Sequence, residues 1–249
     1  MKILIIGESC KDIFTYGECN RICPEAPVPV FVPLYSNENA GMAMNVKNNI
    51  LSLGVECEII TNTNWEEIKK CRYIDERTNQ MFLRVDDNDK ISEPTCDEKV
   101  LNFLQRNIEE YDAVIISDYC KGFFDTDAIE KISKMHTNIF LDTKKLLGDW
   151  CKGVKYIKIN EEEYKRTKHL LDSDIEDRLI ITMGSKGCRY RDKIFDVPAV
   201  EIKDVSGAGD TFISALAVEY IKNQDIVSAI VFANEAATKV VQKRGVSII

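Results

Sequence analysis

The sequence predicts an α/β fold with a mostly parallel central sheet and helices on both of its faces. Short runs rich in isoleucine and valine alternate with longer helical stretches along most of the chain. The runs at 3–6 and 113–116 are apolar at every position, as in strands that are covered on both faces. We therefore expect one domain over residues 1–249, in which right-handed crossovers connect parallel strands.

The apolar runs predict the strands, and glycines that favour helix ends help to set the bounds of the helices between them. The first helix stops before Gly54, because glycine is favoured just after a helix. The last helix has one apolar face, which predicts a buried stripe of Ile226, Ile230, Ala233, Ala237 and Val241. The predicted strands are Ile3–Gly7, Cys57–Thr61, Ala113–Ser117, Asn138–Asp142, Val154–Ile159 and Leu179–Met183. The predicted helices are Met42–Leu53, Asp97–Ile108, Asp125–Met135, Glu161–Leu170, Ala208–Lys222 and Ile226–Val241.

Extra strands are predicted outside this alternation, at Val28–Leu34 and in the pair Arg72–Glu76 and Gln80–Asp86. Open α/β folds bind ligands at the carboxyl ends of their strands. The extra strands therefore form either a small β lid over that edge, from segments 28–35 and 71–86, or an ordinary edge hairpin. A lid would exclude water from a group-transfer reaction.

Charge and cysteine content exclude several classes of function. The chain has 41 acidic and 33 basic residues and a net charge of −8, which argues against binding to nucleic acid or to an anionic membrane. No stretch approaches the roughly 20 apolar residues of a membrane span, and the apolar run Ile3–Ile6 is too short for a signal peptide. Nine scattered cysteines without a Cys-x-x-Cys pair predict reduced thiols in a cytoplasmic protein. Because His136 and His169 are the only histidines, carboxylates are expected to carry any proton chemistry.

The strongest chemical signal is the stretch DVSGAGDTF at 204–212, which leads into a helix. Peptide N–H groups at the start of a helix attract anions, and glycines let the ligand approach closely. A phosphoryl group on Gly207, Ala208 and Gly209, with Asp210 accepting a hydroxyl proton, would form a kinase centre. We expect Asp210 to stay ionised at the helix N-terminus. The alternative is a glycine-rich helix cap without chemistry.

Further candidate groups for a nucleotide and a metal follow strands at the same edge. The chain contains neither a P-loop nor a dinucleotide fingerprint. The turn from Gly184 to Gly187 either presents its amides and Lys186 to a nucleotide phosphate or is a plain hairpin turn. Asn160 and Glu163 have the spacing of a capping box, and their oxygens are also suited to Mg²⁺, bound directly or through water.

Candidate groups for a sugar substrate lie nearer the N-terminus. Asp12 and Asn45 could accept and donate hydrogen bonds to sugar hydroxyls from opposite walls. Lys121 and Lys144, on the loops after two strands, would lie near a phosphate. Each of these residues taken singly is more often a solvated surface group, so their convergence carries the argument.

Taken together, these motifs resemble the ribokinase-type (PfkB) carbohydrate kinases over almost the whole chain. DVSGAGDTF looks like the C-terminal signature of that family, AGMAMNVKNNILSLG at 40–54 is similar to its glycine-rich motif, and Asn160–Glu163 fits its N-x-x-E motif. The resemblance implies a ribokinase-like fold with a β lid, and transfer of the γ-phosphoryl group of ATP to a sugar hydroxyl with Mg²⁺. Segments 62–70 and 164–178 are shorter than in the family.

The resemblance also implies a role for each matching residue. Asp210 would be the general base, and Gly207, Ala208 and Gly209 would form the anion hole. Asp12 and Asn45 would bind sugar hydroxyls, and Asn160 with Glu163 would organise Mg²⁺. The nucleotide-binding residues would be Lys144, Asn160, Gly184, Lys186 and Gly187.

Within the family, three stretches resemble the kinases that phosphorylate D-glycero-β-D-manno-heptose 7-phosphate at C1, an ADP-heptose and lipopolysaccharide precursor. These are RICPEAPVPV at 21–30, QMFLRVD at 80–86 and SDYCKG at 117–122. The distal phosphate of such a substrate would need cations, with Lys11, Arg21, Arg84 and Lys121 as candidates. Lids of related kinases often pair between subunits, which implies a homodimer through the β lid. The alternatives are another sugar, sugar phosphate or nucleoside as acceptor, and a binding protein without turnover.

Overall fold

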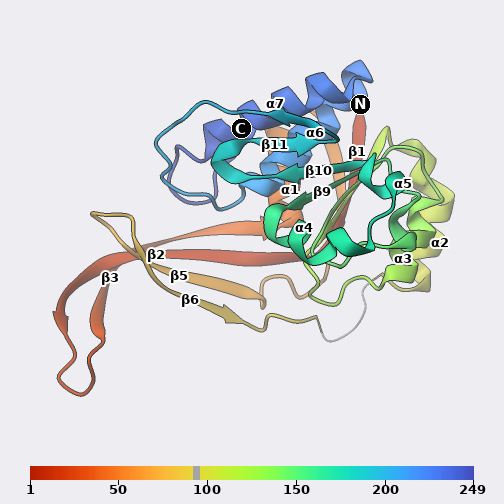
Figure 1. The fold of residues 1–249 in the computed structure, drawn as a ribbon. Helices are drawn as coiled ribbons and strands as arrows, with labels where there is room; N and C mark the ends of the chain where they lie inside the picture. Colours follow the sequence, from red (N-terminus) through yellow and green to blue (C-terminus); the bar gives the residue numbers. More distant parts are fainter. Residues whose placement is uncertain (92–95) are drawn as a thin grey trace.

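Two β-sheets organise the chain, as Figure 1 shows. The structure is a computed structural model, and it describes residues 1–91 and 96–249. The larger sheet has the strand order β12-β11-β10-β9-β8-β7-β1-β4, in which the six strands from β10 to β4 are parallel. Its strands are β1 (Lys2–Gly7), β4 (Glu56–Ile60), β7 (Ala113–Asp118), β8 (Ile139–Thr143), β9 (Tyr156–Asn160), β10 (Leu179–Thr182), β11 (Cys188–Tyr190) and β12 (Lys193–Phe195). The predicted mostly parallel sheet is confirmed.

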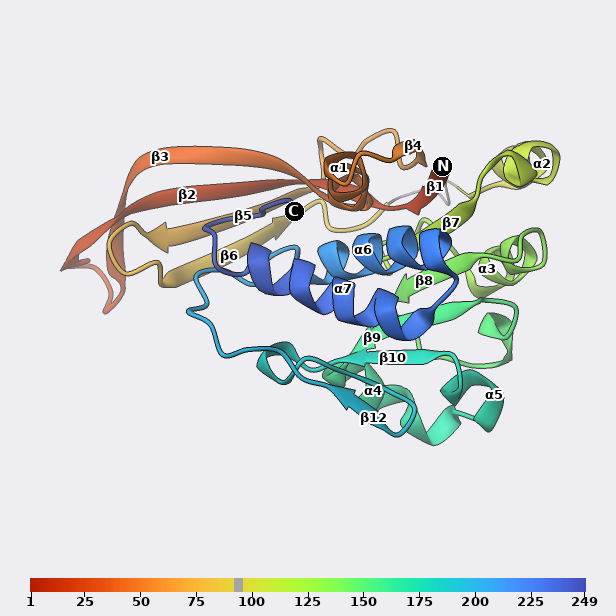
Figure 2. The ribbon, with the colours of Figure 1, turned by 90° about the horizontal axis from the view of Figure 1, so that it is seen from above.

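Helices cover both faces of this sheet, because side chains alternate along each strand. Ile3 and Ile5 face a core shared with α1 (Ala43–Ser52), α6 (Ala208–Asn223) and α7 (Ile226–Val240). Leu4 and Ile6 face the opposite core, which α2 (Glu98–Asn107), α3 (Thr126–Ser133) and the short α5 (Ser173–Glu176) complete. Figure 2 shows α6 and α7 side by side along the sheet. The helix α4 (Glu161–Thr167) follows β9 directly.

Local sequence signals account for the helix boundaries. The side chains of Asp97, Asp125 and Asp225 accept hydrogen bonds from the first turns of α2, α3 and α7, which satisfies N–H groups that a helix start leaves unpaired. Gly54 follows α1 with a φ of 73°, as predicted for a glycine beyond a helix end. No helix of the described residues combines the length and the apolar character that crossing a membrane requires.

The second sheet projects from one side of the molecule as a long arm (Figures 1 and 2). Its strand order is β3-β2-β5-β6, with strands β2 (Ser9–Ile22), β3 (Pro29–Met42), β5 (Lys69–Asp75) and β6 (Met81–Asp87). The segments 28–35 and 71–86, predicted as extra strands, lie in this sheet. The strand β2 was not predicted, because its charged residues and Gly17 obscure the alternation that marks a strand. Its partner β3 runs to Met42, where the sequence predicted a helix start.

The even-numbered residues of β2 from Cys10 to Tyr16 lie on the face of this sheet that packs on the rest of the chain. Phe14 and Tyr16 are buried, and Asp12 is only 6% exposed. Lys70 and Arg72 of β5 lie beside them, because Lys70 pairs in register with Asp12 and Arg72 with Phe14. Charged groups from the arm are therefore held against the carboxyl edge of the large sheet.

Candidate active site

The start of α6 places Asp210 at the centre of the site. Gly207 precedes the helix with a φ of 80°, a conformation that side chains disfavour. A Cβ atom at Gly207 would also lie 2.7 Å from Nδ2 of Asn45. Glycine at 207 therefore lets the first turn of α6 approach α1, and Asp210 becomes buried with 4% of its surface exposed.

Both carboxylate oxygens of Asp210 accept a hydrogen bond from a side chain. Asn45 Nδ2 donates to Oδ2 at 2.9 Å, and the Tyr119 hydroxyl donates to Oδ1 at 2.6 Å. Burial raises the pKa of Asp210 to about 6, although these two hydrogen bonds lower it. Asp210 is thus still mostly ionised at pH 7, as expected, but burial outweighs the helix terminus and makes its pKa higher than the usual value. A carboxyl group with this pKa is suited to accept a proton near neutral pH.

The predicted anion site in front of α6 is smaller than expected. The N–H group of Ala208 donates to the carbonyl of Val205 at 3.2 Å, so it does not point at a ligand. Within residues 1–91 and 96–249, the N–H groups of Gly207 and Gly209 donate to no backbone acceptor. The helix terminus therefore keeps donors for an anion at these two positions, and Ala208 is removed from the predicted set.

A buried ion pair forms the floor beneath this helix terminus. Lys158 Nζ lies 2.8 Å from Asp142 Oδ2, and the two residues pair in register between β8 and β9. A Cβ atom at Gly209 would lie 2.7 Å from Lys158 Nζ, so the ammonium group touches the first turn of α6. Burial lowers the pKa of Lys158, but Asp142, together with the charges of Glu163 and Asp210, outweighs this effect and the pKa is raised. Lys158 thus adds a fixed positive charge to the anion site.

Asp12 faces the site from the arm as half of an ion pair. Arg72 Nη1 lies 2.6 Å from Asp12 Oδ1, and both side chains are largely buried. A Cβ atom at Gly41 would lie 2.1 Å from Asp12 Oδ2, so the glycine of the motif at 40–54 makes room for this carboxylate. The structure brings Asp12 and Asn45 to the same end of the sheet, as predicted, and Arg72 as a partner of Asp12 was not predicted.

Two adjoining cavities lie beside the arm and share Asn39 and Val246 in their linings. One, of about 360 Å³, lies between the arm and the segment 244–246 and is lined by Phe14, Asn37 and Asn39. The other, of about 560 Å³, is lined by Asn39 and Asn45. Amide side chains that donate and accept hydrogen bonds are suited to sugar hydroxyls.

Glu8 fixes the loop that carries Tyr119. Its carboxylate accepts hydrogen bonds from the backbone N–H groups of Tyr119, Lys121 and Phe123. The side chain is completely buried, and burial, with the nearby charge of Asp118, raises its pKa. Glu8 therefore determines where the loop presents the Tyr119 hydroxyl to Asp210.

The N-x-x-E pair forms a capping box at the start of α4. Glu163 N–H donates to Asn160 Oδ1 at 2.9 Å, and Asn160 N–H donates to Glu163 Oε2 at 2.7 Å. The remaining oxygen of Glu163 lies 3.4 Å from Lys144 Nζ. In the described part of the chain, no three His, Cys, Asp or Glu side chains cluster as ligands of a metal. These oxygens fit a Mg²⁺ ion that keeps most of its waters, not a cage of protein ligands.

The cationic candidates are spread over the molecule. Lys121 forms an ion pair with Asp89, and Arg84 forms one with Asp86. Lys11 pairs with Glu38 on the opposite face of β2 from Asp12, so the structure places it away from the site. Arg21 is exposed at the end of β2, next to the turn into β3, and the structure does not bring it together with Asp12 and Asp210.

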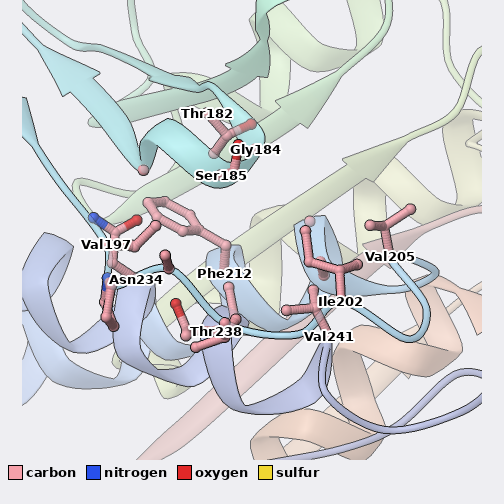
Figure 3. Close-up of a pocket in the computed structure, with 17 residues that line it drawn as sticks. Thr182, Gly184, Ser185, Val197, Ile202, Val205, Phe212, Asn234, Thr238 and Val241 are labelled. Carbon is pink, nitrogen blue, oxygen red and sulfur yellow. The ribbon is translucent and has the colours of Figure 1, made fainter.

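A mostly apolar cavity of about 470 Å³ lies on the other side of the α6 terminus (Figure 3). Phe212, Asn234 and Thr238 point into it from α6 and α7, and the predicted turn contributes Gly184 and Gly187. Lys186 is exposed and does not line this cavity. Ala208 and Gly209 form its boundary toward Asp210, so a ligand that fills it can reach the anion site.

Most of the chain matches a known protein family. A model of the pfkB family carbohydrate kinases matches residues 41–249. The chain belongs to this family. The matched region contains nearly all of the motif at 40–54, the capping box and the whole of α6. The residues around Asp210 thus lie within the part of the chain that defines a PfkB-family carbohydrate kinase.

Known relatives extend the similarity to the full chain. The bifunctional protein HldE of a Nitratiruptor species is 33% identical over 288 residues, which cover 98% of this chain and 62% of that protein. HldE of Helicobacter pylori (strain HPAG1) is 30% identical over 295 residues, covering 98% and 63%. The chain spans about three fifths of the length of these relatives.

Solved structures confirm the ribokinase-like fold. The ribokinase of Thermotoga maritima superimposes with a TM-score of 0.72 at 17% identity, over 98% of this chain and 94% of that one. The ribokinase of Arabidopsis thaliana, solved with ribose and ATP, gives a TM-score of 0.70 at 14% identity, over 98% and 93%.

Five residues of the site were not predicted: Tyr119, Lys158, Asp142, Glu8 and Arg72. Tyr119 lies in the quoted stretch SDYCKG, and Glu8 directly follows the predicted strand Ile3–Gly7. Lys158 and Asp142 lie at the ends of predicted strands, in register across the sheet. A charged residue at the end of an apolar strand is the signal that would have found them.

Proposed function

We propose that this PfkB-family kinase transfers the γ-phosphoryl group of ATP to C1 of D-glycero-β-D-manno-heptose 7-phosphate. The arrangement around Asp210 carries the proposal: a carboxyl group with a pKa of about 6 lies beside helix N–H groups and a buried ammonium group. The Asp210 carboxylate accepts the proton of the attacking hydroxyl. The N–H groups of Gly207 and Gly209, with Lys158, stabilise negative charge on the transferred group.

The cavity beside Phe212 fits the base of a nucleotide. Its walls are mainly apolar, and Asn234 and Thr238 supply polar atoms, the composition expected of a pocket for a flat heterocycle. Its boundary at Ala208 and Gly209 would direct the phosphates of ATP toward Asp210. Lys144 and Glu163 would meet these phosphates and the waters of Mg²⁺, which would supply charge neutralisation when bound.

The heptose phosphate assignment rests on the resemblance of 21–30, 80–86 and 117–122 to heptose 7-phosphate kinases, and on similarity to proteins named HldE. The stretch SDYCKG contributes Tyr119 and Lys121 near the site. The stretch at 80–86 contributes Arg84. Another sugar or sugar phosphate is the alternative acceptor.

A product-resolved assay tests this function. The chain is incubated with ATP, Mg²⁺ and heptose 7-phosphate, and phosphorus NMR identifies the phosphorylated position; Asp210→Asn is run in parallel. Phosphorylation at C1 that depends on Asp210 is the expected result. If a different acceptor is phosphorylated, the proposed substrate is wrong and the proposed kinase activity is retained. ATP-dependent thermal stabilisation without any product from a panel of sugars would indicate a binding protein.

We also propose a homodimer formed through the arm. Several large apolar side chains of β3 and β6 are exposed: Val32, Leu34, Met81, Leu83 and Val85. Exposed apolar side chains that gather on one sheet are typical of an interface. Light scattering of the wild type and of Leu83→Glu tests this, and a monomeric wild type would reject it. From the nine scattered cysteines without a Cys-x-x-Cys pair, we further propose that the protein works in the reducing cytoplasm.

A further inference from the structure

Lys70 is a largely buried lysine for which the described residues supply no carboxylate partner. Lys70 lies on β5, and only 5% of its surface is exposed. No Asp or Glu oxygen of the described residues lies within 4.0 Å of its Nζ atom, and Nζ makes no hydrogen bond with them. Lys70 Nζ is not among the fully buried side-chain atoms without a partner, so the apolar stem is buried while the ammonium group keeps contact with solvent. Within residues 1–91 and 96–249, the Lys70 ammonium group is thus a positive charge without a direct anionic partner.

The neighbouring carboxylates do not supply this partner, because each is already paired. The register of the sheet places Lys70 beside Asp12 on β2 and Asp86 on β6. Both carboxylates bind arginines, and the nearby Lys121 also has its own partner: the pairs are Asp12–Arg72, Asp86–Arg84 and Asp89–Lys121. These pairs leave Lys70 without a direct partner, and the remaining negative charge nearby is that of Asp210, which contacts Asn45 and Tyr119 and not Lys70.

The Lys70 ammonium group instead lies over the ring of Tyr119, whose centroid is 5.0 Å away. Lys144 Nζ lies 4.7 Å from the centroid of the same ring. The hydroxyl of that ring contacts Asp210 at 2.6 Å. Lys70 therefore reaches from the arm to the immediate surroundings of the base, and an aromatic ring is a weaker partner for an ammonium group than an anionic oxygen.

We propose that Lys70 binds a phosphoryl group that arrives with the substrates. A phosphate dianion provides the missing opposite charge and oxygens that accept the ammonium N–H groups. Two sources carry this chemistry: the phosphate of a sugar phosphate acceptor and the phosphoryl group in transfer from ATP. The proposal deepens the proposed function by assigning a residue to phosphate recognition, and it depends on that function only for the names of the substrates.

Binding of inorganic phosphate tests the site without any turnover. Lys70→Met removes the charge and keeps most of the apolar stem, and Lys69→Met is the matched control on the opposite face of the same strand. We expect phosphate to raise the melting temperature of the wild type and of the control, with little effect on Lys70→Met. Lys70→Arg, which keeps the charge, should retain the response and shows that the position tolerates substitution.

Kinetics with the wild type and the same variants then identify the source of the phosphate. If the acceptor supplies it, Lys70→Met loses about 10- to 100-fold of the preference in kcat/KM for heptose 7-phosphate over the unphosphorylated sugar. If the phosphoryl group in transfer is the one that Lys70 binds, the ratio of the affinities for ATP and ADP should instead fall about 10- to 100-fold in Lys70→Met. An unchanged phosphate response together with two unchanged preferences would overturn the proposal. A wild type that responds to phosphate but phosphorylates no sugar keeps the Lys70 site and rejects the proposed function.

Discussion

The Tyr119 hydroxyl and the Asp210 carboxylate are joined by a 2.6 Å hydrogen bond, although 91 positions separate them in the chain. Asn45 occupies the other oxygen of Asp210 and is itself buried in α1. Each oxygen of an ionised carboxylate has a second lone-pair site, so an acceptor hydroxyl can approach Asp210 while both donors stay in place. Tyr119 is the less buried of the two donors, and Glu8 holds the backbone of its loop.

Replacing Tyr119 by phenylalanine is expected to shift the pH dependence of the reaction. The free base must be deprotonated, so kcat/KM of the wild type should rise with pH through the Asp210 pKa of about 6. The Tyr119 hydrogen bond lowers this pKa. Its loss should therefore raise the pKa and move the acid limb of the profile to higher pH.

The measurement is kcat/KM between pH 5 and pH 8 for the wild type, for Tyr119→Phe and for Tyr73→Phe, a tyrosine of the arm. The control should keep the wild-type midpoint. A midpoint that is identical in all three proteins would show that the hydroxyl does not control the ionisation of Asp210.

Asp210→Asn is expected to lower kcat by roughly 10²- to 10⁴-fold and to leave the affinity for ATP nearly unchanged. The same substitution should make the folded protein more stable at neutral pH, although it lowers the activity. The pKa of Asp210 is raised in the folded protein from 3.8 to about 6, so folding favours the protonated form and loses stability as pH rises between these values. A neutral asparagine avoids this loss.

At pH 7 the free energy of unfolding of Asp210→Asn should consequently exceed that of the wild type by up to about 3 kcal/mol. The variant should therefore unfold at a higher urea concentration. The asparagine amide would face the donor groups of Asn45 and Tyr119, which reduces the gain. The difference should shrink below pH 5, where Asp210 becomes protonated. A variant that is less stable at pH 7 than at pH 4, relative to the wild type, would contradict the raised pKa.

The sequence contained enough local information for the main sheet, the helix starts and the position of Asp210. The aspartates at 97 and 125 cap helices through residues only two or three positions away, so these boundaries are local properties. The same holds for the capping box from Asn160 to Glu163. Signals of this range can be read without knowledge of the fold.

The remaining features depend on contacts that the sequence does not contain. The pair Asp12–Arg72 joins residues 60 positions apart, and β2 becomes a strand because long partners lie on both sides of it. The raised pKa of Asp210 follows from burial, which the motif DVSGAGDTF cannot reveal. The helix terminus alone predicted the opposite direction.

Gly207→Ala is expected to abolish most of the activity. The alanine would adopt a φ of 80°, which costs about 1–2 kcal/mol, and its Cβ would lie 2.7 Å from Asn45 Nδ2. Asn45 would have to move and release Asp210. Gly54→Ala is the matched control, because Gly54 has a φ of 73° and no atom within 4 Å of a Cβ there.

Both alanine variants should lose stability in urea unfolding, with the larger loss in Gly207→Ala, and only Gly207→Ala should lose kcat. An equal loss of activity in both would mean that backbone strain, and not the contact with Asn45, explains the effect. An active Gly207→Ala would show that Asn45 is dispensable for holding Asp210.

Filling the cavity beside α7 is expected to weaken nucleotide binding selectively. Thr238→Trp would place an indole in the cavity of about 470 Å³ that Phe212 and Asn234 also line. The KM for ATP should rise about 10-fold or more, because the indole occupies space that the base needs. The KM for the sugar should change little, since Asn39 and Asn45 line different cavities. Lys239→Trp introduces the same side chain at an exposed neighbour outside this cavity, and it should keep the wild-type KM for ATP. If both variants bind ATP as the wild type does, the base lies elsewhere, and the path of the phosphates past Gly209 to Asp210 must start from another side of α6.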